Sequence, residues 1–106
     1  ILDMIERSHP DQFAAQIHAL LGRPDATSLL GGVRCPTLVL CARQDTWSPL
    51  ARHEVMAGLI PGSVLHVIEH SGHMSPMERP QDVAQAMRTW LAWPASGTAP
   101  TEGRDA

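Results

Sequence analysis

Residues 35–49 read Cys-Pro-Thr-Leu-Val-Leu-Cys-Ala-Arg-Gln-Asp-Thr-Trp-Ser-Pro. The run 36–42 within them is almost continuously apolar, which is typical of a strand buried on both faces in a parallel sheet. Its proline is compatible with a strand because it stands at the first position. Ser48-Pro49 then indicates the start of a helix. The stretch therefore predicts a strand, a loop that carries Asp45, and a helix.

A second strand and a last helix follow along the chain. Pro61-Gly62 ends the helix that begins at Ser48-Pro49. Residues 64–68 then alternate between apolar and polar side chains, which indicates a strand with one more solvated face. A loop of small and polar residues spans 69–79, and Pro80 opens the last helix. This order predicts an α/β fold, a parallel βαβα unit with a right-handed crossover. Two strands alone cannot make a stable parallel sheet with both faces covered, so a neighbour that the chain does not obviously contain is expected beside residues 37–42.

Helical signals also precede the first strand. Residues 11–21 carry apolar side chains at helical spacing, and a short helical turn is expected over 25–30, where Gly31-Gly32 ends it. Glu78-Arg79 is expected to cap or salt-bridge the last helix. Residues 95–106 lack any periodicity and predict a flexible tail. The apolar residues expected to pack inward are Phe13 and Ile17 in the earliest helix, Val55, Met56, Leu59 and Ile60 in the next, and Val83, Ala84, Met87, Trp90 and Leu91 in the last. For Phe13 and Ile17 the alternative is that they face a pocket.

The composition limits size, partners and location. A length of 106 residues predicts one domain at most, and a net charge of −3 gives no electrostatic reason to expect nucleic acid or a membrane surface as a partner. A cytoplasmic location is the default expectation, because the sequence shows neither a bilayer-spanning apolar run nor a signal peptide. The first residue is Ile1 and not Met, which is compatible with a truncated product. Cys35 and Cys41 would stand roughly 20 Å apart on one strand, beyond disulfide reach, and both are expected to be small buried apolar residues.

Two residues with catalytic potential follow the two predicted strands. Asp45 stands just past the end of the first strand, and His73 stands in the loop after the second. In open parallel sheets, ligands bind outside the carboxyl ends of the strands. A carboxylate that accepts a hydrogen bond from one imidazole nitrogen leaves the other nitrogen to take a proton from a nucleophile. The alternative interpretation is that Asp45 caps the following helix and that His73 hydrogen-bonds within its own loop.

Four segments of the chain resemble the α/β-hydrolase family in order and spacing. They are residues 35–49, Ile60-Pro61-Gly62-Ser63, Val67-Ile68-Glu69, and Ser71-Gly72-His73-Met74-Ser75-Pro76-Met77-Glu78-Arg79-Pro80. The resemblance covers residues 29–91 and is to the branch of esterases, lactonases and C–C bond hydrolases with a helical cap. It implies that Asp45 is the triad acid and His73 the triad base, in the chain order that this fold uses. It also implies that residues 1–32 are the end of the cap region with a linker, and that residues 33–94 are the C-terminal part of the hydrolase core.

The family's nucleophile is missing from this sequence. In the family it lies on a G-x-S-x-G turn, and no serine in the chain has glycines two positions to either side. The amides of the oxyanion hole belong to the same missing regions. The chain is therefore expected to be a C-terminal fragment whose longer parent hydrolyses an ester, a lactone or a related bond. The isolated chain is expected to be inactive.

The remaining expectations concern the pocket and the partners. Trp47 and Met74, beside the acid and the base, are predicted to contact a small-molecule substrate, with a packing role as the alternative. No cofactor or metal is implied, because His66, His70 and His73 have no Cys or carboxylate at ligand spacing. The expected partner is the N-terminal half of the hydrolase or a second copy. A non-catalytic fragment that associates through an exposed sheet edge is the alternative function. These residues do not specify the substrate or the nucleophile.

Overall fold

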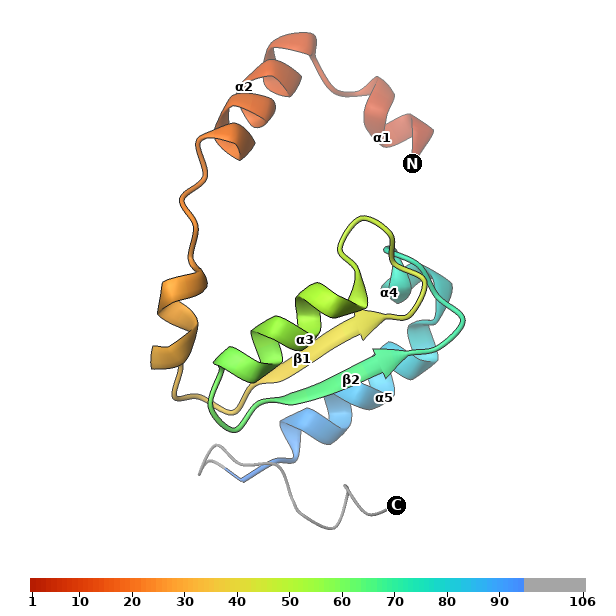
Figure 1. Cartoon of the computed structure of the whole chain (residues 1–106). Helices are drawn as coiled ribbons and strands as arrows, with labels where there is room; N and C mark the ends of the chain where they lie inside the picture. The colour runs from red at the N-terminus through yellow and green to blue at the C-terminus, as the bar shows by residue number, and fades with distance from the viewer. Residues whose placement is uncertain (95–106) are drawn as a thin grey trace.

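The computed structural model describes residues 1–94, so the tail predicted over 95–106 lies outside the described residues. Its elements are α1 (Leu2–Glu6), α2 (Pro10–Leu21), the 3-10 helix η1 (Thr27–Gly32), β1 (Leu38–Ala42), α3 (Leu50–Leu59), β2 (Val64–Ile68), α4 (Ser75–Glu78) and α5 (Pro80–Leu91) (Figure 1). Both predicted strands and the three longer predicted helices are confirmed. The turn expected over 25–30 is η1, which begins at Thr27 and includes Gly31 and Gly32 before it ends. α1 was not predicted, and α4 interrupts the segment expected to be a loop.

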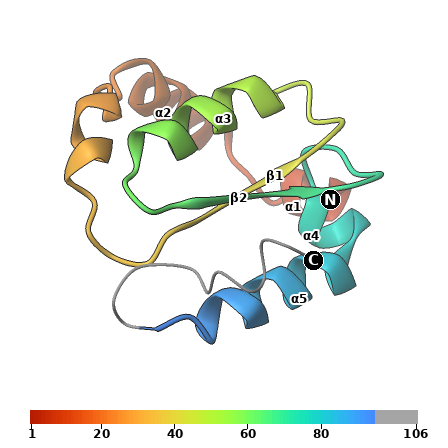
Figure 2. The same ribbon diagram turned by 60° about the horizontal axis from the view of Figure 1, so that its bottom comes forward.

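The two strands form a parallel sheet, as the sequence predicts. Their register runs from Leu38 opposite Val64 to Ala42 opposite Ile68. α3 packs on one face of this sheet and α5 on the other, as the edge-on view of Figure 2 shows. Both strands point the same way, so the loops that follow them begin at the same end of the sheet (Figure 1). The fold thereby brings the Asp45 loop and the His73 loop together.

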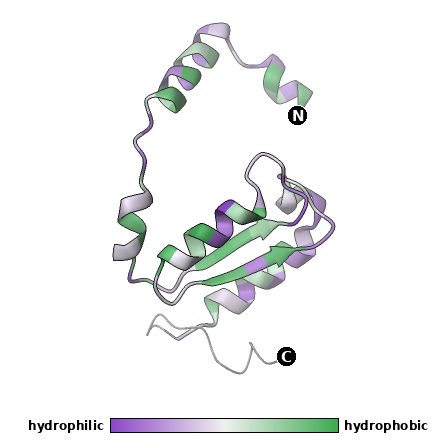
Figure 3. Cartoon of the chain, in the orientation of Figure 1, coloured by the Kyte–Doolittle hydropathy of each residue, from purple (hydrophilic) through white to green (hydrophobic). Residues whose placement is uncertain are grey.

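A small apolar core lies between the sheet and its two covering helices. Its buried residues are Val39, Cys41, Ala42, Ile60, Ile68, Val83 and Ala86. Figure 3 shows that the strands carry much of the apolar character of this unit. Ile68 is only 1% exposed and occupies the last position of β2, directly before the His73 loop. Burying a side chain of this size contributes about 1.5–3 kcal/mol, so the ends of the strands are firmly held.

Several residues predicted to be buried are exposed. They are Met87 and Leu91 in α5, Val55 and Leu59 in α3, and Cys35 before β1. In α5 the inward positions are Val83 and Ala86, while Trp90 is half-buried and donates a hydrogen bond from Nε1 to the Pro36 carbonyl at 3.2 Å. Neighbouring strands lie only about 4.8 Å apart, so a two-stranded sheet is too narrow to cover the whole apolar stripe of a helix. Cys35 is exposed because β1 begins three residues later, at Leu38.

The N-terminal helices α1 and α2 lie apart from the sheet (Figure 1), and none of their residues is buried. A capping box fixes the start of α2. His9 Nδ1 accepts from the N–H of Asp11 at 3.1 Å, and Gln12 Oε1 accepts from the N–H of His9 at 3.2 Å. Phe13 is 64% exposed and Ile17 40% exposed, so the prediction that they pack inward is wrong. Within residues 1–94, no helix combines the length and the apolar character needed to cross a bilayer.

Candidate active site

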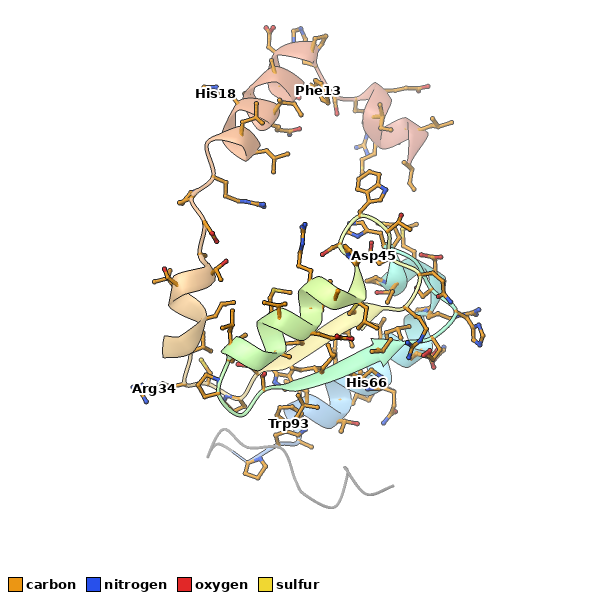
Figure 4. The ribbon with its side chains drawn as sticks, in the orientation of Figure 1. Phe13, His18, Arg34, Asp45, His66 and Trp93 are labelled. Carbon is orange, nitrogen blue, oxygen red and sulfur yellow. The ribbon has the colours of Figure 1, made fainter. Side chains whose placement is uncertain are left out.

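Asp45 lies in the loop that leaves the carboxyl end of β1. Its residue is only 8% exposed. One carboxylate oxygen, Oδ1, accepts hydrogen bonds from the backbone N–H groups of Trp47 and Ser48, each at 3.0 Å. The other oxygen, Oδ2, is turned toward His73. Figure 4 shows Asp45 beyond the strand ends, whereas His66 lies farther back along β2.

The hydrogen bonds to Asp45 favour its ionised form. They lower the pKa of the Asp45 carboxyl below its usual value, and the largest cause is the Ser48 N–H, followed by the bond with His73. An ionised carboxylate can only accept hydrogen bonds. The proton shared with His73 therefore belongs to the imidazole.

His73 meets Asp45 across the two loops. Its Nδ1 lies 2.9 Å from Asp45 Oδ2, and its side chain is half exposed. With Nδ1 donating to the carboxylate, Nε2 is the ring nitrogen that can take up a proton. The helix-capping alternative for Asp45 does not hold for α3, because the N-cap of that helix is Pro49. Asp45 instead closes the turn that precedes α3, and it does so with the oxygen that does not face His73.

Trp47 packs against the face of the His73 ring. The two ring centroids are 5.5 Å apart and the ring planes are inclined by 25°. Trp47 is nonetheless 81% exposed, so most of the indole is available to another molecule. Met74, the N-cap of α4, is 48% exposed beside His73. Their role in binding substrate stays a prediction.

Two side chains at the junction of α4 and α5 form hydrogen bonds with the loop that carries His73. The Glu78 carboxylate accepts a hydrogen bond from the N–H of Gly72 at 3.2 Å, and Arg79 Nε donates to the His70 carbonyl at 2.9 Å. The interpretation of Glu78-Arg79 as a cap or salt bridge of the last helix is borne out only in part: Arg79 is the N-cap residue of α5, and its carbonyl accepts from the Val83 N–H at 3.1 Å, but its side chain makes no capping hydrogen bond. Both side chains reach back to the His73 loop, which a sequence pattern of short spacing does not reveal.

Sequence reasoning also missed two residues that join the loops, Gln44 and Ser71. The N–H of Gln44 donates to the Ser71 carbonyl at 2.9 Å, and the N–H of Ser71 donates to Gln44 Oε1 at 2.8 Å. Their positions in the sequence could have indicated this contact, because Gln44 directly precedes Asp45 and Ser71 stands two residues before His73.

One hollow lies away from the pair Asp45 and His73. It has a volume of about 550 Å³ and is lined by residues 23–27, Leu30 and part of α3, without Asp45 or His73. Within residues 1–94, no three His, Cys, Asp or Glu side chains are grouped so that they could hold a metal ion.

Comparison with known proteins points to one family. The model of the alpha/beta hydrolase family matches residues 4–86. The chain is 33% identical over 88 residues to 2-hydroxy-6-oxononadienedioate/2-hydroxy-6-oxononatrienedioate hydrolase of Klebsiella pneumoniae, an alignment that covers 81% of this chain and 30% of that protein. It is 29% identical over 82 residues to the putative carbamate hydrolase RutD of Pseudomonas syringae, covering 77% of this chain and 31% of the relative.

A solved structure agrees with these sequence matches. A thermophilic esterase from Thermogutta terrifontis superimposes with a TM-score of 0.64 at 50% identity, covering 66% of this chain and 26% of the esterase. The chain thus spans less than a third of the length of each of these three proteins.

Proposed function

The chain belongs to the α/β-hydrolase family, and from that membership we propose that it supplies the acid Asp45 and the base His73 of a catalytic triad whose nucleophile lies outside these 106 residues. The observation that carries the proposal is the 2.9 Å contact between His73 Nδ1 and Asp45 Oδ2 at the carboxyl ends of two parallel strands. That contact gives the imidazole the orientation and the tautomer that a general base needs. On this proposal the chain is a C-terminal fragment of a hydrolase.

The chemistry that follows is acyl transfer in two stages. His73 Nε2 takes the proton of the nucleophile as that group attacks the substrate carbonyl, and the ionised Asp45 stabilises the imidazolium that forms. Nε2 then gives this proton to the leaving group, and a covalent acyl intermediate remains. Water attacks the intermediate by the same route, with His73 again the base. The bond cleaved is an ester, a lactone or a related bond.

Trp47 and Met74 are proposed to line the mouth of this site. Both side chains are partly exposed. Trp47 lies in the loop that carries Asp45, and Met74 directly follows His73 in the other loop. The indole offers a large apolar surface at a low entropy cost, because few of its rotations must be fixed. Residues 1–32 are proposed to be the end of a cap region, in keeping with the lack of any buried residue in α1 and α2, and residues 33–94 part of the core.

A chimera tests the acid and base assignments directly. The quarter of the Thermogutta terrifontis esterase that aligns with this chain is replaced by the matching residues of the chain, and hydrolysis of a p-nitrophenyl ester is measured. We expect an active chimera whose kcat falls by roughly 10⁴ with Asp45→Asn or His73→Ala. His66→Ala, at an exposed histidine of β2, is the matched control and should retain activity. An active chimera that tolerates His73→Ala refutes the proposal.

The isolated chain is proposed to be inactive because it lacks a nucleophile and oxyanion donors. Purified chain incubated with a p-nitrophenyl ester should give no steady turnover. Turnover that His73→Ala abolishes would show that the chain carries a nucleophile of its own.

A second candidate function is association through a sheet edge. Within residues 1–94, the outer edges of β1 and β2 have no strand beside them, and unpaired edges are templates for pairing. The partner would be the N-terminal half of the hydrolase or a second copy of this chain. Size-exclusion chromatography tests the second copy: a concentration-dependent dimer supports it, and a monomer at all concentrations argues against it.

A further inference from the structure

The parallel pairing of β1 and β2 continues past the ends of both strands. The last strand pair is Ala42 with Ile68. Beyond it, the N–H of Arg43 donates to the Ile68 carbonyl at 3.0 Å, and the Arg43 side chain forms an ion pair with Glu69. Gln44 then pairs with Ser71. The acid and the base are the last members of a continuous series of contacts.

From one pair of this series to the next, the first loop moves on by one residue and the second loop by two. The partners are 26 positions apart for Arg43 and Glu69, 27 for Gln44 and Ser71, and 28 for Asp45 and His73. Each step of one residue on the first loop therefore meets a step of two residues on the second. The residues passed over on the second loop are His70, which has a left-handed φ of 53°, and Gly72. Each pair in the series sets the position of the next.

Within this series, Gln44 hydrogen-bonds to both the N–H and the carbonyl of its partner, Ser71. Its own N–H donates to the Ser71 carbonyl at 2.9 Å, and its side-chain Oε1 accepts from the Ser71 N–H at 2.8 Å. Ser71 is 2% exposed, so its backbone N–H has little access to water and would be left without a hydrogen-bond partner if the Gln44 side chain were removed. Two opposed hydrogen bonds fix both the separation and the rotation of the two loops, which one bond cannot do.

Building on the proposed function, we propose that Gln44 is a positioning residue for the acid and the base. By clamping Ser71 it holds His73 at the distance and angle where Nδ1 meets Asp45 Oδ2. Among the described residues, the hydrogen bonds of Gln44 go to Ser71 and not to His73. Its effect reaches the imidazole through Ser71 and Gly72. The side-chain carbonyl is the essential group, because the backbone N–H is present in any residue at this position except proline.

The tautomer of neutral His73 is the readout that separates this role from a general effect on stability. Long-range ¹H–¹⁵N correlation spectra of the ¹⁵N-histidine-labelled chain distinguish a proton on Nδ1 from one on Nε2. Wild type should hold the proton on Nδ1, next to Asp45. Gln44→Leu removes the acceptor and should lower the ratio of Nδ1–H to Nε2–H about tenfold. Gln44→Glu keeps an acceptor oxygen at the same reach and should preserve the ratio.

Two further variants calibrate the measurement. Gln81→Leu, at an exposed glutamine in the first turn of α5, should leave the ratio unchanged. Asp45→Asn should lower it as far as Gln44→Leu or farther. If Gln44→Leu keeps the wild-type ratio while Asp45→Asn loses it, the positioning role is overturned and the acid assignment stands. If Asp45→Asn also keeps the ratio, the acid–base pairing itself fails, and the proposed function fails with it.

Discussion

His73 Nδ1 lies 2.9 Å from Asp45 Oδ2, and the two residues come from loops 28 positions apart. The contact follows from the register of the sheet, because Ala42 and Ile68, the last residues of the two strands, are directly paired. Asp45 and His73 each follow the end of their strand by only a few residues. The buried ends of the two strands therefore set the positions of the proposed acid and base.

Asp45→Asn should make the stability of the chain less dependent on pH. The pKa of Asp45 is lower in the folded chain than in the unfolded chain, so its carboxylate stabilises the fold above the unfolded pKa of about 4. That contribution is lost as the pH falls through the folded pKa. The difference in free energy of unfolding between wild type and Asp45→Asn should accordingly be larger at pH 7 than at pH 3. Urea denaturation at both values measures it, with Asp82→Asn, at an exposed carboxylate of α5, as the control. An equal difference at both pH values would contradict the prediction.

The sequence predicts the elements of this unit well because their patterns are local. The apolar run before Ala42 and the alternation over residues 64–68 each identify a strand, and the positions of Asp45 and His73 after those strands predict that they meet. The burial of individual helix residues was predicted less well. Leu91 follows a helical period but is 72% exposed, because burial depends on how wide the neighbouring sheet is. The contact between Gln44 and Ser71 depends on how two distant loops are aligned, which periodicity does not encode.

Ile68→Val should destabilise the fold by about 1 kcal/mol, since it removes one methylene group from the most enclosed position of the core. Leu91→Ala, which removes more atoms from a position that is 72% exposed, should change the free energy of unfolding by less than about 0.5 kcal/mol. Urea denaturation compares the two variants with wild type. A larger loss for Leu91→Ala would show that α5 packs through a face other than the one that carries Val83 and Ala86.

His70 holds a left-handed backbone conformation, with φ at 53°, where the second loop makes its extra step. A β-branched residue is strained in this region, so His70→Val should cost roughly 1–2 kcal/mol of stability. Glycine adopts it freely, so His70→Gly should be at least as stable as His70→Ala. Urea midpoints of the three variants test the order Gly, Ala, Val. Since the His70 carbonyl still accepts from Arg79 in each variant, the series isolates the backbone effect. Equal midpoints would mean that the left-handed conformation is not maintained in solution.

The stack of Trp47 on His73 should make indole fluorescence report the charge of the imidazole. The ring centroids are 5.5 Å apart, close enough for a cation–π interaction when His73 is protonated. A protonated imidazole quenches a neighbouring indole, so the emission of Trp47 should be weaker when His73 is protonated than when it is neutral. Trp90 and Trp93 also emit, and the difference between wild type and Trp47→Phe isolates the signal of Trp47.

His73→Ala should abolish the pH-dependent part of that signal, whereas His66→Ala, at an exposed histidine within β2, should leave it intact. A pH response that survives His73→Ala would place the quenching group elsewhere and remove the stack as its cause. A response that is lost with His73→Ala shows that Trp47 senses the proton that the proposed base takes up.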